Sequence, residues 1–179
     1  SVAAGSRLSG NRRFIGAAPD CNIVVVKLKP IKQYLREYYL IPEDVPCYQE
    51  TDLIQAIQYL QKFAVSLYSP LVICLGVGTN LGDHSGVSVF ARYLDLVMGR
   101  KSRAAVTCTG NEGNAAHHYH GELTRQQSSQ NVEIRVGGEM GGFVMDFWGG
   151  VPYIYTVTIR SPGGESIQWI NPQLRKPQE

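Results

Sequence analysis

Two patterns of hydrophobic and polar residues follow one another along the chain, and the change falls near residue 120. Before it, short continuous apolar runs alternate with segments that carry apolar residues at helical spacing. Continuous apolar runs are typical of parallel strands that are covered on both faces. The alternation of such runs with helices predicts a parallel sheet with flanking helices. The predicted strands are 23–28, 71–75 and 104–109, and the predicted helices are 31–38, 52–66 and 87–98.

After the change, apolar and polar residues alternate singly, and Gly and Pro mark frequent turns. Closely spaced alternating strands predict an antiparallel β segment. The fold class is therefore α/β, a parallel sheet with flanking helices followed by an antiparallel β segment. A boundary within 118–128 divides the chain into 1–120 and 121–179. The predicted strands of the second part are 132–136, 143–148, 153–159 and 166–170.

Two helix ends carry recognisable signals. Asp52 can cap the helix over 52–66, and Gln55 stands three residues later, where it would complete a capping box. Gly99 follows the last apolar residue of the helix over 87–98, and glycine commonly ends helices.

Composition describes a folded globular protein of 179 residues, with 44% hydrophobic and 18% charged residues. The net charge of +2 does not favour a nucleic acid or an acidic membrane surface as a partner. No apolar run reaches the length that spans a bilayer. Four widely spaced cysteines without metal-ligand spacing indicate a reducing compartment. The chain starts at Ser1 rather than at Met, so we expect a processed or excised piece.

Candidate chemistry begins where the predicted strand over 104–109 breaks into Gly110-Asn111-Glu112-Gly113. Ligands bind at the carboxyl ends of strands in open α/β sheets. An asparagine amide held there can donate a hydrogen bond to a developing oxyanion. The alternative is a polar turn that only ends the strand.

Four short segments follow one another in the first part of the chain: Val2-Ala3-Ala4-Gly5, Gly16-Ala17-Ala18-Pro19, 75–76 and 110–113. By their order and spacing, with the predicted strands and helices between them, the first 116 residues resemble the subtilisin-like serine peptidase superfamily (subtilases). Segments 25–29, 78–84 and 113–118 look like the clostridial spore-germination protease branch. Members of that branch carry a jelly-roll domain inserted after the oxyanion asparagine. The alternating strands from about Val132 look like the start of that insertion, which would be incomplete here.

The resemblance implies a role for each matching position. Asn111 matches the oxyanion donor, whereas Glu112 matches a residue that supports the turn and receives no catalytic role. The strand that pairs with an extended peptide substrate is matched by Leu75, Gly76, Val77 and Gly78. The opposite wall of the specificity pocket is matched by Cys108, Thr109 and Gly110.

The resemblance also places the catalytic Asp and His upstream of Ser1 and the nucleophilic Ser downstream of Glu179. We therefore expect a middle fragment of a bacterial serine endopeptidase, inactive alone, with a cytoplasmic or spore-associated location. Its expected partners are a peptide or protein substrate and the remainder of the parent protease. One alternative is a pseudoprotease with a regulatory or scaffold role in the same fold. Another is an α/β nucleotide-binding protein, which ranks last because no glycine-rich phosphate loop follows the first strand.

Other candidate sites are weaker. The run Asp83-His84-Ser85 contains the three residue types of a Ser-His-Asp catalytic triad. Adjacent residues in a Gly-rich loop, however, cannot easily take up the hydrogen-bonded geometry of a triad. His117, His118 and His120 can ligate zinc in principle, yet no nearby Cys or carboxylate pattern completes a site, so a linker is favoured. The loop over 7–14 looks shorter than the calcium loop of secreted relatives. We therefore predict no metal and no cofactor.

Overall fold

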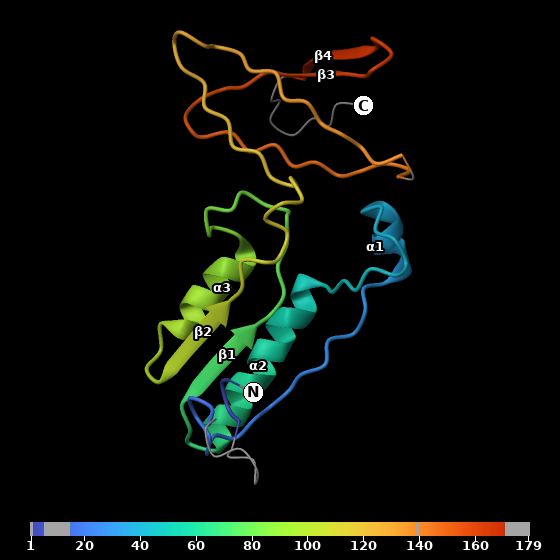
Figure 1. Ribbon diagram of the computed structural model, residues 1–179. Coiled ribbons are helices and arrows are strands. Elements are labelled where there is room, and N and C mark those ends of the chain that lie inside the picture. The colour runs from blue at the N-terminus through green and yellow to red at the C-terminus, as the bar shows by residue number, and fades with distance from the viewer. Residues whose placement is uncertain (1, 6–14, 139, 171–179) are drawn as a thin grey trace.

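The computed structural model describes residues 2–5, 15–138 and 140–170, and their elements form two groups (Figure 1). The first group mixes helices with parallel strands, and the second is an antiparallel pair. The predicted fold class is confirmed. The first group contains α1 (Gln33–Tyr38), α2 (Glu50–Ser66), β1 (Leu71–Leu75), α3 (Val89–Met98) and β2 (Arg103–Thr107), and the second contains β3 (Val157–Arg160) and β4 (Ser166–Ile170).

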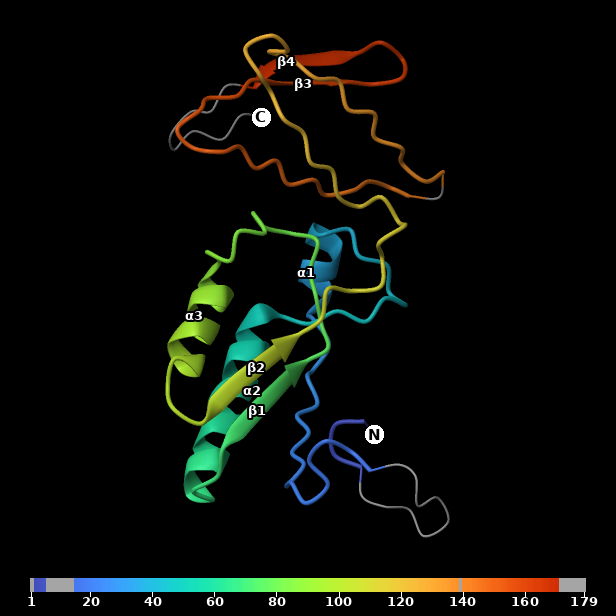
Figure 2. The same cartoon turned by 60° about the vertical axis from the view of Figure 1, so that its left-hand side comes forward.

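Strands β1 and β2 pair in parallel, from Leu71 opposite Arg103 to Leu75 opposite Thr107. Helices α2 and α3 contact this sheet and each other, and Figure 2 shows α2 behind the two strands and α3 to their left. The helices and the sheet bury a common apolar cluster. Each helix contributes apolar residues from one face, and each strand contributes alternate residues that point to the same side of the sheet. Its buried members are Ile57, Ile73, Leu75 and Val97.

The opposite face of the two-stranded sheet is exposed. Val72 and Val106 are 70% and 58% exposed, and Cys74 and Ala104 are exposed beside them. Parallel sheets are normally covered on both faces. The described residues therefore cover one face of this sheet and leave an apolar face open.

Helix termini agree with the sequence only in part. Gly99 ends α3 as predicted, and its amide donates to Asp95 O at 2.8 Å. The prediction for Asp52 is wrong: α2 begins two residues earlier, with Gln49 as N-cap and no side-chain capping bond. Asp52 instead lies in the first turn, where its carboxylate forms an ion pair with Lys29 at 3.4 Å. The N-cap of α3, Ser88, was not predicted; its hydroxyl accepts from the Ala91 amide at 3.1 Å.

Three predicted strands are absent from the structure, although their residues are described. Segments 23–28, 132–136 and 143–148 contain no strand. Each has the apolar composition of a strand, but a strand also needs a hydrogen-bonded neighbour. Val25 is 84% exposed and Ile134 is 50% exposed, so these side chains have no second layer to cover them. The predicted strand over 153–159 shortens to β3, whereas β4 has its predicted bounds.

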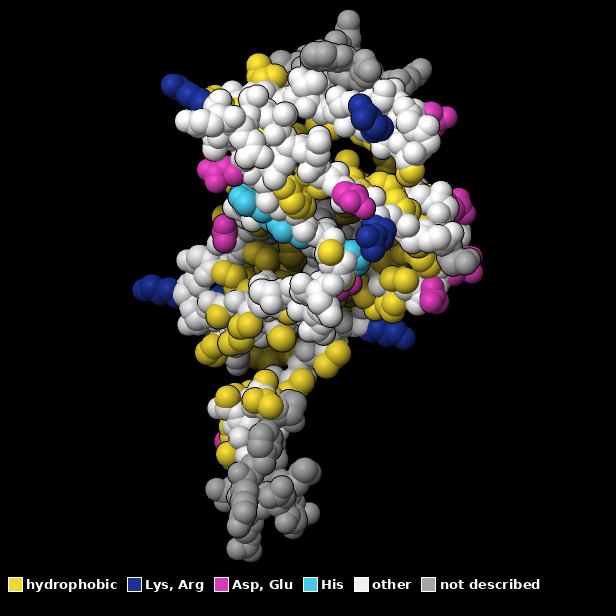
Figure 3. Space-filling view, turned by 45° about the horizontal axis from the view of Figure 1, so that its top comes forward, with side chains coloured by type: hydrophobic (Ala, Val, Ile, Leu, Met, Phe, Trp, Pro, Cys, Tyr) yellow, Lys and Arg dark blue, Asp and Glu magenta, His cyan; other side chains and the backbone are white. Residues whose placement is uncertain are grey.

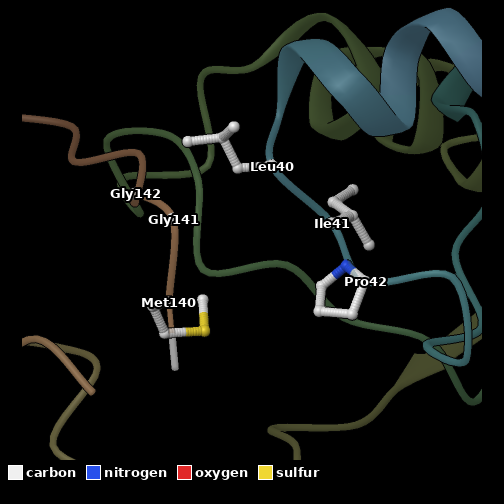
Figure 4. A pocket seen from close by; sticks show the side chains of 6 residues that line it. All are labelled: Leu40, Ile41, Pro42, Met140, Gly141 and Gly142. Atoms are coloured by element: carbon white, nitrogen blue, oxygen red, sulfur yellow. The ribbon is translucent and has the colours of Figure 1, made fainter. Parts of the chain in front are cut away.

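A small apolar hollow with a volume of about 210 Å³ lies between the loop after α1 and residues 140–142 (Figure 4). A Cβ atom on Gly142 would lie 2.8 Å from Leu40 Cδ1, so a larger residue at this position would require the Leu40 side chain to shift. The lining residues are Leu40, Ile41, Pro42, Met140, Gly141 and Gly142.

The chain exposes far more surface than a folded monomer of its mass. Its accessible surface is 15930 Å² at 19.8 kDa. A compact monomer of that mass exposes about 8600 Å². Among the described residues, no helix is both long and apolar enough to cross a membrane.

Candidate functional site

The carboxyl ends of β1 and β2 lie side by side, because Leu75 pairs in register with Thr107. The two predicted walls, 75–78 and 108–110, therefore lie at the same edge of the sheet. Residues 76–78 and 108–110 are exposed, whereas Leu75 is buried. A Cβ atom on Gly76 or Gly78 would meet nothing within 4 Å, so the space beside this backbone is open.

Asn111 lies directly after the second wall, in an exposed turn. Gly110 has a φ of 80°, a left-handed conformation that glycine adopts without strain. The turn continues with a bond from the Ala115 amide to Glu112 O at 2.9 Å. Asn111 therefore begins an exposed turn that directly follows the wall 108–110.

A polar bridge, formed by Asn80, Glu112 and His117, joins the two loops that leave this edge. Asn80 Nδ2 donates to Glu112 Oε2 at 3.1 Å, and His117 Nδ1 lies 3.0 Å from the same oxygen. Asn80 Nδ2 and His117 Nδ1 are 3.4 Å apart. The Asn80 hydrogen bond, followed by the hydrogen bond and charge of His117, lowers the pKa of Glu112 below its ordinary value.

The loop after β1 has further contacts. His84 Nε2 lies 3.4 Å from Asn80 O, and the His84 and His118 rings meet edge to face at 5.6 Å. The amide of Gly82 donates to Asp146 Oδ2 at 2.9 Å, so this loop also contacts the second part of the chain. Figure 3 shows histidine side chains in a band across one face of the molecule.

The run Asp83-His84-Ser85 does not form a relay. The Ser85 hydroxyl donates to the Asp83 carboxylate rather than to His84. Over residues 2–5, 15–138 and 140–170, no group of three or more His, Cys, Asp or Glu side chains has an arrangement that could hold a metal ion. The predicted absence of a calcium loop concerns 7–14, which lies outside the described residues.

The fold of this chain is subtilase-like, as the comparison with solved structures shows. The chain is similar to a Clostridium perfringens protein whose structure is titled "Structure of the Clostridium Perfringens CspB protease". The TM-score is 0.66 and the sequence identity is 26%, over 74% of this chain and 28% of that chain. No protein-family model and no curated protein matches the chain. The predicted resemblance is thereby confirmed for the fold, while the boundary near 120 and the site roles stay predictions.

Sequence reasoning missed the polar bridge. Asn80 received no role, and Glu112 was expected only to support its turn. Asn80 and Glu112 are 32 residues apart, and their meeting depends on the pairing of β1 with β2. The one available signal was that each follows a predicted strand of the same parallel sheet. Asp146 gave no comparable signal, because it lies in a segment predicted to be a strand.

Proposed function

We propose that this chain is part of a bacterial subtilisin-like serine endopeptidase, located in the cytoplasm or associated with the spore. It supplies the substrate-binding strand and the oxyanion amide. The observation that carries the proposal is the β1–β2 register, which brings 75–78 and 108–111 to one edge in a fold similar to that of a protease. The chain spans 28% of the similar CspB chain, so the activity proposed is that of a longer protein.

An extended peptide would bind beside residues 75–78 by strand addition, with its backbone amides and carbonyls paired to theirs. The exposed backbone at Gly76 and Gly78 supports this, since the adjacent space is open. The segment 108–110 would form the facing wall of the pocket for one substrate side chain. The scissile carbonyl would then lie near Asn111.

Asn111 would act on the transition state. When a serine hydroxyl attacks the scissile carbonyl, negative charge develops on the carbonyl oxygen, and the Asn111 amide would donate a hydrogen bond to it. The attacking Ser and its His and Asp partners match no residue of this chain, so we propose that other parts of the protease supply them. The chain alone would then not cleave peptides.

The open face of the sheet supports the remainder of the parent protease as a partner. Val72 and Val106 form part of an exposed apolar face, and parallel sheets are covered on both sides in stable proteins. The total exposed surface, well above that of a compact monomer, agrees with this. Additional helices or strands of the protease would cover that face.

The proposal is tested by Asn111→Ala in the complete protease. Loss of one oxyanion donor, as known from subtilisin, lowers kcat by about 100- to 1000-fold, and we expect a fall of this order with KM changed by less than about threefold. Peptide hydrolysis kinetics give both constants. Asn114→Ala, in the same exposed turn, is the matched control and should retain activity. An unchanged kcat in Asn111→Ala would remove Asn111 from this role.

A pseudoprotease with a regulatory or scaffold role is the second candidate, since the same fold serves either function. Labelling with a fluorophosphonate separates the two. The complete protein is labelled if it is a protease and is not labelled if it is a pseudoprotease. This chain by itself should not be labelled in either case. Labelling of the isolated chain would contradict the proposal that other parts of the protease supply the nucleophilic Ser.

A further inference from the structure

We propose that a basic pocket at the amino end of the parallel sheet binds a phosphate group, either free or carried by a small phosphate monoester. The basic pocket lies between the second half of α2 and the segment that joins α3 to β2, and its volume is about 360 Å³. It shares no residue with the candidate site, so the inference does not depend on the proposed function. The lining residues are Gln58, Gln61, Lys62, Val65, Arg100 and Arg103.

The basic pocket and the candidate site lie at opposite ends of the sheet. Arg103 is the first residue of β2, and it pairs with Leu71, the first residue of β1. Both strands run from there toward Leu75 and Thr107, after which the predicted walls begin. Figure 2 shows the two strand arrows pointing away from the end at which the segment after α3 enters β2. The length of a strand therefore separates the two sites.

The basic pocket gathers positive charge without a counter-charge. Lys62, Arg100 and Arg103 line it, and none of its lining residues is acidic. Among the residues that the structure describes, the ion pairs join other side chains and leave these three cations unpaired. Like charges in one concavity repel each other and raise the local concentration of anions. The basic pocket therefore favours an anionic ligand, although the net charge of the chain is only +2.

Arg103 is held in place for contact with an anion. Its side chain is half-buried, and Nη1 donates to Gln61 Oε1 at 2.5 Å. The Gln61 amide is fixed in turn, because its Nε2 donates to the Tyr93 hydroxyl at 3.2 Å. An arginine carries five N–H donors in a planar fork, so one bond to Gln61 leaves most of them available. The guanidinium thus offers already oriented donors to the oxygens of a phosphate or carboxylate.

The number of cations favours phosphate over carboxylate. A carboxylate carries one negative charge, which would leave most of the positive charge of the basic pocket unbalanced. A phosphate monoester carries about 1.5 to 2 negative charges at pH 7 and has three acceptor oxygens. It can therefore contact Arg103, Lys62 and Arg100 together. Val65 is 59% exposed beside them and offers an apolar contact to the organic part of a monoester.

The helix dipole accounts for one of these cations but not for all three. Cations are stabilised near the C-terminus of a helix, and Arg100 directly follows Gly99, the C-cap of α3. Lys62, however, precedes the last turn of α2, and Arg103 lies on β2. Three different elements therefore bring their cations to one pocket, and a phosphate group would be their common partner.

The test is isothermal titration calorimetry of the complete protein with two probes, inorganic phosphate and phenyl phosphate. We expect both to bind. Tighter binding of phenyl phosphate would identify a monoester as the ligand, and equal or weaker binding would identify free phosphate. Benzoate carries a similar ring with a single negative charge and should bind at least about tenfold more weakly than phenyl phosphate.

Variants of the basic pocket locate the bound phosphate. Arg103→Gln removes an oriented, half-buried cation and should weaken phosphate binding by about tenfold or more. Lys62→Gln removes an exposed cation and should weaken it by about two- to fivefold. Arg103→Lys keeps the charge but loses the planar fork, so it should recover only part of the affinity. Arg92→Gln, at an exposed arginine of α3 outside the basic pocket, is the matched control and should bind as wild type does.

Thermal denaturation separates a loss of binding from a loss of folding. Within the described part of the chain, Lys62 forms no hydrogen bond or ion pair, so Lys62→Gln should keep the melting temperature of wild type when phosphate is absent. Phenyl phosphate should raise the melting temperature of wild type, because a ligand of the native state stabilises it. At the same concentration, Lys62→Gln should show a smaller rise.

Three outcomes would overturn the proposal. The first is the absence of binding for both phosphate probes. The second is equal affinity for phenyl phosphate and benzoate, which would exclude recognition of the phosphate charge. The third is an equal loss of affinity in Arg92→Gln and Arg103→Gln, which would indicate attraction by the overall charge rather than by the basic pocket. Peptide hydrolysis is not a readout here, so the proposed role of Asn111 is decided separately.

Discussion

The α/β part and the β part of this chain are both rich in apolar residues, but they differ in how far they bury them. Every buried hydrophobic residue among those described lies before residue 120, in α2, β1 or α3. After residue 120, Trp148 and Ile154 are 61% and 84% exposed, and one hairpin, β3–β4, is formed. Helices packed on a sheet therefore complete a small core, whereas strands with alternating apolar residues need a second sheet or a helix to cover their apolar face.

The largest expected effect separates the two parts. Ile57 is 1% exposed and packs against the sheet, so Ile57→Ala should lower the free energy of unfolding by about 2–5 kcal/mol. Ile167, on β4, is 61% exposed, and Ile167→Ala should lower it by less than about 0.5 kcal/mol. Urea denaturation of the chain measures both. Similar losses in the two variants would contradict the comparison.

The same difference explains which elements the sequence predicts. The helix over 52–66 and the strand 71–75 were found near their predicted bounds, because periodicity and chain breaks act locally. The strands at 23–28 and 132–136 were not found, since a strand depends on a neighbour that its own residues do not specify. The predicted cap at Asp52 failed for a related reason: its carboxylate pairs instead with Lys29, 23 residues away in the sequence.

In the candidate site, too, features of the strands were predictable, whereas contacts between distant loops were not. That 75–78 and 108–111 lie at the same edge of the sheet was predictable, because parallel strands end at a common edge. The bridge from Asn80 to Glu112 was not predictable, since it depends on how two long loops fold over that edge. Likewise, the bond from Gly82 to Asp146 links residues 64 positions apart, and no pattern in either segment indicates it.

A smaller effect tests whether the open face of the sheet is covered in a longer protein. Val97 is 5% exposed and Val106 is 58% exposed, so Val→Ala makes the same chemical change in a closed and an open environment. In this chain, Val97→Ala should lower the free energy of unfolding by about 1–2 kcal/mol and Val106→Ala by less than about 0.5 kcal/mol.

In the complete protease, Val97→Ala and Val106→Ala should lower the free energy of unfolding by similar amounts, because further helices or strands would bury Val106. Thermal or urea denaturation of both proteins measures the four differences. If Val106→Ala remains without cost in the complete protease, that face stays open, and the proposed contact with the remainder of the protease fails there.

The smallest expected effect concerns Lys29, which follows segment 23–28 directly. Its ion pair with Asp52 connects this segment, which forms no strand, to α2. Asp52 is 10% exposed and Lys29 is 68% exposed, and Asp52 Oδ2 is buried without a hydrogen-bond partner among the described residues. Removing the ammonium leaves this carboxylate without its cation, so Lys29→Met should lower the free energy of unfolding by about 0.5–1 kcal/mol. Lys27→Met, at an exposed position two residues earlier, is the matched control and should have no measurable effect. Adding Asp52→Asn to Lys29→Met should restore part of the loss, because the unpaired charge is removed; equal stabilities for the two lysine variants would show that this ion pair does not hold the segment to α2.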